Sequence, residues 1–248
     1  MKKILQRILF GLLILLILST GGFILWAETP SQPGENALAA LQSDTVVQVV
    51  QHGNYISFEP VGATPTTGFI FYPGGHVDFR AYAPILRRIA AQGYLVVLVR
   101  VKLNLAFFDV EAGAPAFNDF PQITHWVTGG HSLGGVAAAY FAHAHLQQIN
   151  GIVFWASYPA DDRLKDSGIK MLSVYGTEDG GLDNGAKIEE YKAFQTPDTQ
   201  FVVIQGGNHA QFGDYGPQPG DKPATISYES QWQQATDATV QFLASFTP

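Results

Sequence analysis

The sequence contains no cysteine, which excludes disulfide bonds, thiolate metal sites and a cysteine nucleophile. Positive charge is also scarce: beyond the first few residues there is no run of Lys or Arg, and the formal net charge is −7. Nucleic-acid binding requires a basic stripe, so we exclude that class of protein. The sequence shows no cluster of metal ligands and no cofactor motif, and we expect neither a metal nor a cofactor.

A long apolar run stands at the beginning of the chain. No charged residue occurs between Arg7 and Glu28, and about 20 apolar residues are enough for a helix to cross a membrane. Trp26 lies at the outer end of this run, where an indole ring favours the membrane interface. Because the basic residues precede the run, we expect the rest of the chain to lie outside the cytoplasm.

A cleaved signal peptide is the alternative, with its apolar part over residues 8–18. Its cleavage site is poor, because the bulky Leu25 stands third from a cut after Ala27. We therefore expect residues 1–27 to form a transmembrane signal-anchor, or else a signal peptide. Residues 28–36, rich in Pro and polar side chains, then form a linker, and residues 37–248 form one domain that is membrane-anchored or, after cleavage, secreted.

Strand-like and helix-like segments alternate along this domain. Two β-branched runs around His52-Gly53-Asn54 predict an antiparallel hairpin. The pattern indicates an α/β fold with a mostly parallel central sheet and helices on both faces. The predicted strands are 46–50, 55–61, 68–72, 94–101, 125–128, 152–156, 171–175 and 201–204, and the predicted helices are 82–91, 134–146, 187–194 and 231–246. Sheets of this kind bind ligands at the carboxyl ends of their strands.

The segment after residues 125–128 reads Gly-Gly-His-Ser-Leu-Gly-Gly and precedes an Ala-rich helix. This is G-x-S-x-G at a strand-to-helix turn, a pattern that exposes a serine hydroxyl in a strained backbone conformation. Ser132 is therefore the predicted nucleophile. Gly130 and Gly134 stand where a side chain would clash with the neighbouring strand or helix. The N–H of Leu133, at the start of the helix, can stabilise an oxyanion.

A nucleophilic serine needs a base, and the base needs an orienting carboxylate. Asp179 follows strand 171–175 and His209 follows strand 201–204, in the order Ser, Asp, His. Glu178 and Asp183 are the alternatives to Asp179. Of the other histidines, His131 belongs to the serine turn itself and is expected to shape it.

The loop after strand 68–72 reads Pro-Gly-Gly-His and should supply the second oxyanion donor. Either Gly75 or His76 fills this role, since glycine lets a backbone N–H approach a substrate closely. The segment 104–122 contains several aromatic residues, which could simply cover the core. The sharper interpretation is that some of them, namely Phe107, Phe108 and Phe117, wall an apolar acyl pocket. Only about a dozen residues separate strands 152–156 and 171–175, too few for a lid domain.

The motifs FYPGGHVDFRAY, HWVTGGHSLGG, VYGTEDG and GGNHAQFGDYG resemble the α/β-hydrolase family over nearly all of residues 46–246. They are most similar to a compact bacterial subgroup related to dienelactone hydrolases, from which the chain departs because those enzymes use a Cys nucleophile. The resemblance implies a serine esterase with a catalytic triad, acting on short or medium acyl esters of small molecules. An amidase, peptidase or deacetylase with the same triad is the alternative, and a non-catalytic membrane-anchored binding protein is a further one.

Overall fold

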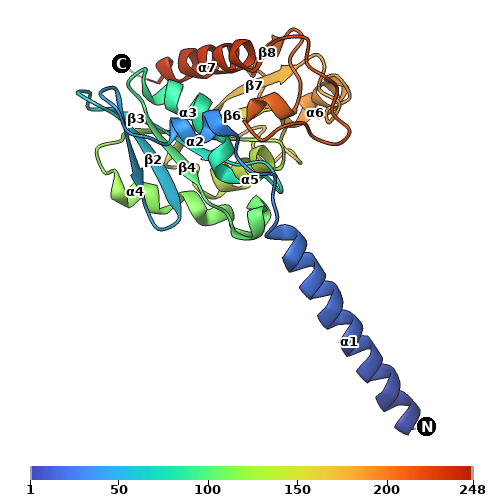
Figure 1. The fold of residues 1–248 in the computed structure, drawn as a ribbon. Coiled ribbons are helices and arrows are strands. Elements are labelled where there is room, and N and C mark those ends of the chain that lie inside the picture. Colours follow the sequence, from blue (N-terminus) through green and yellow to red (C-terminus); the bar gives the residue numbers. More distant parts are fainter. Residues whose placement is uncertain (1, 247–248) are drawn as a thin grey trace.

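The computed structural model describes residues 2–246 (Figure 1). Its first helix, α1 (Lys2–Ala27), projects away from the rest of the molecule as a single rod, and only Ala27 of it is buried. This helix is long and apolar enough to cross a membrane. Residue 1 of the predicted anchor and residues 247–248 of the predicted domain lie outside the described residues.

The domain is built on an eight-stranded sheet whose order is β1-β2-β4-β3-β5-β6-β7-β8. The first two strands form the predicted antiparallel hairpin, β2 also runs antiparallel to β4, and all other neighbours are parallel. The predicted fold class is thereby confirmed. The strands are β1 (Val47–Gln51), β2 (Tyr55–Pro60), β3 (Thr67–Tyr72), β4 (Leu95–Val99), β5 (His125–His131), β6 (Ile149–Trp155), β7 (Lys170–Gly176) and β8 (Gln200–Ile204).

Successive residues of the central strands point to opposite faces of the sheet, and both faces are covered. On β3, Phe69 and Phe71 enter one apolar core, which includes residues of α3 and α7, and Ile70 and Tyr72 enter another, which includes residues of α5. This is why the central strands read as continuous apolar runs. The helices of the domain are α2 (Glu35–Ala40), α3 (Ala83–Ala90), α4 (Pro115–Asp119), α5 (Leu133–Ala144), α6 (Ala186–Tyr191) and α7 (Tyr228–Ala244).

Several elements begin or end at other residues than predicted: β6 and α7 each begin three residues earlier, and the short helices α2 and α4 were not predicted. The strand β5 continues three residues further than predicted, because Gly129 and Gly130 still pair with β3 and β6. The predicted linker, residues 28–36, is tied to the domain: the Ser31 N–H donates to the His76 carbonyl at 2.9 Å, and the Gly34 N–H donates to the Asp214 carbonyl at 2.6 Å. Its last residues also begin α2. The connection from β6 to β7 contains no helix, as expected of a chain without a lid.

Candidate active site

Ser132 lies between the end of β5 and the start of α5, with φ of 52° and ψ of −123°. A non-glycine residue at positive φ is strained by about 1–3 kcal/mol and persists only where its surroundings hold it. The Ser132 N–H donates to the Trp155 carbonyl at 3.0 Å. Its carbonyl accepts from the Gly135 N–H at 3.0 Å and from the Ser157 hydroxyl at 2.6 Å. The turn is thus fixed from both sides, and Ser157 is a support that the motif did not reveal.

The glycines of the turn permit close backbone approaches. A Cβ on Gly130 would lie 2.5 Å from the backbone carbon of Gly134. A Cβ on Gly134 would lie 2.3 Å from the carbonyl oxygens of both Tyr72 and Pro73. The predicted clashes at these two positions are confirmed, and they explain why the turn can pack directly against β3.

Asp179 and His209 lie together in the interior, 0% and 3% exposed. The His209 Nδ1 is 3.0 Å from each carboxylate oxygen of Asp179, and the Leu182 N–H donates to one of these oxygens at 2.9 Å. Within residues 2–246, neither alternative acid, Glu178 or Asp183, has a hydrogen bond to the His209 ring. The buried pair has the geometry in which a carboxylate orients an imidazole.

Two side chains that the sequence analysis missed fix the backbone around His209. The Gln231 amide, fully buried, accepts from the Asn208 N–H at 3.0 Å and donates to the Asn208 carbonyl at 2.7 Å. The Asp221 carboxylate accepts from the N–H groups of Gly180 and His209, at 3.1 and 3.3 Å. Asp221 therefore joins the loop that carries Asp179 to the loop that carries His209.

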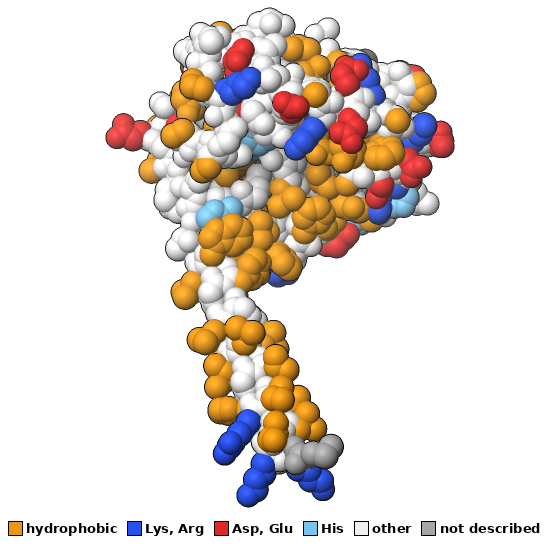
Figure 2. Space-filling view, turned by 90° about the vertical axis from the view of Figure 1, so that its right-hand side faces the viewer, with side chains coloured by type: hydrophobic (Ala, Val, Ile, Leu, Met, Phe, Trp, Pro, Cys, Tyr) orange, Lys and Arg blue, Asp and Glu red, His pale blue; other side chains and the backbone are white. Residues whose placement is uncertain are grey.

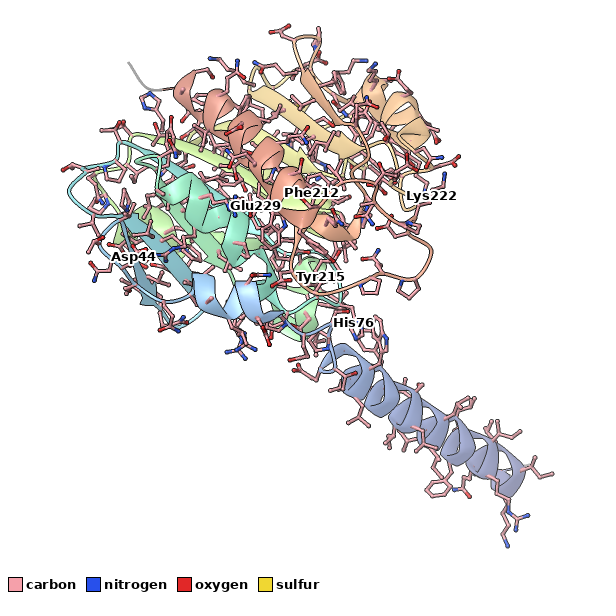
Figure 3. The ribbon with its side chains drawn as sticks, turned by 45° about the horizontal axis from the view of Figure 1, so that its top comes forward. Asp44, His76, Phe212, Tyr215, Lys222 and Glu229 are labelled. Carbon is pink, nitrogen blue, oxygen red and sulfur yellow. The ribbon has the colours of Figure 1, made fainter. Side chains whose placement is uncertain are left out.

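The loop after β3 lies against the start of α5. A Cβ on Gly75 would lie 2.8 Å from the Leu133 side chain, so the two predicted oxyanion donors are neighbours. The His76 N–H donates to the Asn104 carbonyl at 2.8 Å and is therefore already engaged. Among the described residues, no acceptor takes the Gly75 N–H. Of the two alternatives, the geometry favours Gly75. Figure 3 shows His76 where α1 meets the domain.

Buried hydrogen bonds hold the loop after β3 in place. The Gly74 N–H donates to the Tyr82 hydroxyl at 3.0 Å, and this hydroxyl is hydrogen-bonded to the His131 Nδ1 at 2.8 Å. The His131 ring also packs against the His209 ring, with centroids 4.5 Å apart. Burial lowers the pKa of the His131 imidazole well below its usual range, and the neighbouring His209 lowers it further. His131 is thus a neutral structural residue that links the serine turn to the loop after β3.

Ser132 and His209 line one cavity of about 270 Å³. None of the three phenylalanines predicted to wall it does so. Phe117 packs against Phe141 in the core beside α5, with ring centroids 5.7 Å apart, and Phe107 and Phe108 are 47% and 53% exposed. The other residues of the cavity wall are Leu133, Val136, Ala156, Ser157, Tyr158, Gly181, Leu182 and Gln218.

A larger hollow, of about 660 Å³, lies beside the end of α1 and is lined by Arg100, Lys102 and Phe108 among others. It includes neither Ser132 nor His209, so the smaller cavity is the candidate reaction site. In the part of the chain that the structure describes, no group of three His, Cys, Asp or Glu side chains is arranged to hold a metal ion.

Comparison with known proteins places the geometry in context. Residues 68–233 match the model of the alpha/beta hydrolase family. Among solved structures, a dienelactone hydrolase from Anabaena variabilis ATCC 29413 has a TM-score of 0.55 and 18% identity, over 80% of this chain and 97% of that one. An esterase/lipase from an uncultured bacterium has a TM-score of 0.58 and 12% identity, over 85% of this chain and 88% of that one. These similarities show a shared fold. No curated protein sequence matches the chain.

Proposed function

Because the chain belongs to the alpha/beta hydrolase family, we propose that it is a serine hydrolase, a carboxylesterase with Ser132 as its nucleophile. The observation that carries this proposal is the buried Asp179–His209 pair, whose imidazole lines the same cavity as a strained serine. A carboxylate, an imidazole and a serine hydroxyl are the groups that this kind of acyl transfer requires.

The proposed reaction has two steps. His209 takes the Ser132 proton while the oxygen of Ser132 bonds to the ester carbonyl carbon. The N–H groups of Leu133 and Gly75 stabilise the oxyanion, and protonated His209 then gives its proton to the departing alcohol. Asp179 stabilises the imidazolium. His209 then deprotonates a water molecule, which attacks the acyl-enzyme. The bond to Ser132 breaks to release the carboxylic acid, and protonated His209 returns its proton to the Ser132 oxygen.

The size of the cavity supports short or medium acyl groups. At about 270 Å³ it lies below the range of about 300–1,000 Å³ that is usual for sites that enclose drug-sized ligands. The apolar side chains of Leu133, Val136 and Leu182 line it and suit an acyl chain. No helix between β6 and β7 covers it.

We further propose that residues 1–27 are a retained membrane anchor and that the hydrolase domain lies outside the cytoplasm. The length and apolar character of α1 and the basic residues at its beginning support this. The contacts of Trp26 support retention over cleavage, because its ring stacks on His76 with centroids 4.2 Å apart.

The test is hydrolysis of p-nitrophenyl acetate, butyrate and longer esters by the full chain in detergent, compared with Ser132→Ala and His209→Ala. We expect both variants to lose activity by at least about a thousandfold, and butyrate to be preferred to long chains. A folded wild type that is inert on every ester would refute the esterase proposal. Full activity in Ser132→Ala would show that the nucleophile is another residue.

A further inference from the structure

The C-terminal end of α1 contacts the domain at the carboxyl ends of the parallel strands, where the candidate site also lies. The Trp26 carbonyl is 2.6 Å from the His76 Nε2, and the Asn104 side-chain amide donates to the Ala27 carbonyl at 3.0 Å. His76 follows β3 and Asn104 follows β4, so both lie at carboxyl ends of parallel strands. Ser132, at the end of β5, lies at the same edge. An anchor joined there turns this edge of the domain toward the membrane.

The contacts of α1 also indicate how deep the domain reaches. Trp26 stands at the end of the apolar run, at the level of the membrane interface. Phe23 lies three residues earlier, about 4.5 Å further along the helix axis toward the membrane. The ring of Phe108, a residue of the domain, packs edge-on against the Phe23 ring with centroids 6.1 Å apart. Phe108 therefore extends to the depth of the apolar part of α1.

From Phe108, aromatic and apolar side chains continue to the cavity, beside the Arg163 guanidinium, which lies 4.1 Å from the centroid of the Tyr140 ring. The neighbouring Phe107 packs against Tyr140, with ring centroids 5.8 Å apart. Tyr140 and Val136 lie one turn apart on α5 and share its surface, and Val136 lines the cavity with Ser132. We call Phe23, Phe108, Phe107, Tyr140 and Val136 the apolar track. Figure 2 shows apolar side chains gathered on the face of the domain directly beside the end of α1.

We propose that substrates reach Ser132 from the bilayer along this track, and that they are acyl esters of membrane-held amphiphiles. The cavity then holds the reacting ester with its short acyl group, and the apolar remainder of the molecule lies along the track. The proposal rests on the proposed esterase function and on the anchor. The track is continuous with α1, and the exposed Phe107 and Phe108 lie where the anchor enters the membrane. We therefore expect the bilayer to cover this surface.

The test compares two butyrate esters that differ only in the alcohol. The full chain is reconstituted in phosphatidylcholine vesicles, and butyrate release is measured from water-soluble ethyl butyrate and from vesicle-held hexadecyl butyrate. We expect hexadecyl butyrate to react about tenfold faster, since its tail concentrates it in the bilayer beside the track. The double variant Phe107→Ser/Phe108→Ser should lower the hexadecyl-to-ethyl ratio by about tenfold.

Val61→Ser is the matched control. Val61 is an exposed apolar residue, 52% accessible, that follows β2 at the opposite edge of the sheet, and its replacement should leave the ratio unchanged. If ethyl butyrate were hydrolysed and hexadecyl butyrate were not, the inference would be overturned and the esterase proposal would stand. Hydrolysis of neither ester would contradict both. If the wild type were a dimer and the double variant a monomer with an unchanged hexadecyl-to-ethyl ratio, the face would bind a second copy of the chain instead of the bilayer.

A second measurement does not depend on activity. Because the chain has no cysteine, Phe108→Cys introduces a single thiol for an environment-sensitive dye. Nitroxide-bearing lipids should quench this dye in vesicles and should leave a dye at Val61→Cys unquenched. Equal quenching at the two positions, or none at Phe108→Cys, would overturn the placement of the track at the membrane.

Discussion

The Tyr82 hydroxyl offers the sharpest test of how the candidate site is held in place. It accepts from the Gly74 N–H at 3.0 Å and is hydrogen-bonded to the His131 Nδ1 at 2.8 Å, and both Tyr82 and His131 are buried. Tyr82→Phe removes this oxygen alone. The ring is retained, with its packing against Phe71 at a centroid distance of 5.2 Å. The substitution leaves two polar groups in the interior without their partner.

The expected loss follows from these two groups. An unpaired buried donor or acceptor costs about 1–3 kcal/mol, so for the two groups we expect the free energy of unfolding to fall by about 2–6 kcal/mol. In a domain of this size, each kcal/mol corresponds to about 2–4 °C, which gives a decrease in Tm of about 4–24 °C. Removing an oxyanion donor costs about 10²–10³ in kcat. Because Tyr82→Phe would displace the proposed Gly75 donor through Gly74 and would not remove it, we expect kcat to fall about tenfold.

Thermal unfolding and steady-state hydrolysis of p-nitrophenyl butyrate measure the two effects separately. Tyr55→Phe is the control, since the Tyr55 hydroxyl donates to Asp119 at 2.7 Å from β2, which β4 and β3 separate from β5. We expect this control to lose stability and to retain its kcat. If Tyr82→Phe lost stability with kcat unchanged, Tyr82 would not position the loop after β3 that carries the proposed oxyanion donor.

Three further outcomes follow from the site. Asp179→Asn should lower kcat by on the order of 10³–10⁴ in steady-state kinetics while circular dichroism stays unchanged, and a loss below tenfold would show that another acid orients the base. Gly134→Ala places a Cβ 2.3 Å from the Tyr72 carbonyl and should lower Tm and abolish hydrolysis, whereas Gly53→Ala, which meets open space, should do neither. Since burial lowers the pKa of His131, the unfolded chain takes up this proton first on acidification, and stability should fall below about pH 6.5 by up to about 1.4 kcal/mol per pH unit. Urea unfolding at pH 7, 6 and 5 should show a shallower decline for His131→Gln, and equal declines would contradict the assignment.

The fold and the serine turn were predictable because their signals are local. Most strands of the parallel sheet are short apolar runs, and G-x-S-x-G occupies consecutive residues, so neither signal requires knowledge of distant contacts. Asp179 and His209 each follow a predicted strand, which placed both at the same side of the sheet. In the structure the His209 Nδ1 lies 3.0 Å from the Asp179 Oδ1. Asp221 and Gln231 carry no comparable motif. Their roles arise from hydrogen bonds to backbone groups of other loops, which only the folded chain brings within reach.

The aromatic residues of segment 104–122 could not be assigned from sequence for a related reason. Phe117 lies in a short helix, α4, and is partly buried against the core residues Trp126 and Phe141, away from the cavity. Phe107 and Phe108 are equally apolar side chains of the same segment, but they lie on the surface. Periodicity over three or four residues cannot distinguish these environments, because it reports that a side chain is apolar and not which surface it meets.

The contacts between α1 and the domain were the feature least predictable from sequence, and they bear on the proposed anchor. A polar, Pro-containing segment after an apolar run predicts a linker. Residues 28–36 are instead hydrogen-bonded along the domain surface, and Trp26 stacks on His76. His76 lies one residue after Gly75 and donates its own N–H to Asn104, which in turn binds the end of α1. Removing residues 1–27 therefore removes a packing partner of the loop that carries the proposed oxyanion donor, together with the proposed membrane segment. The full chain is for this reason the form in which the activity of the site has to be measured.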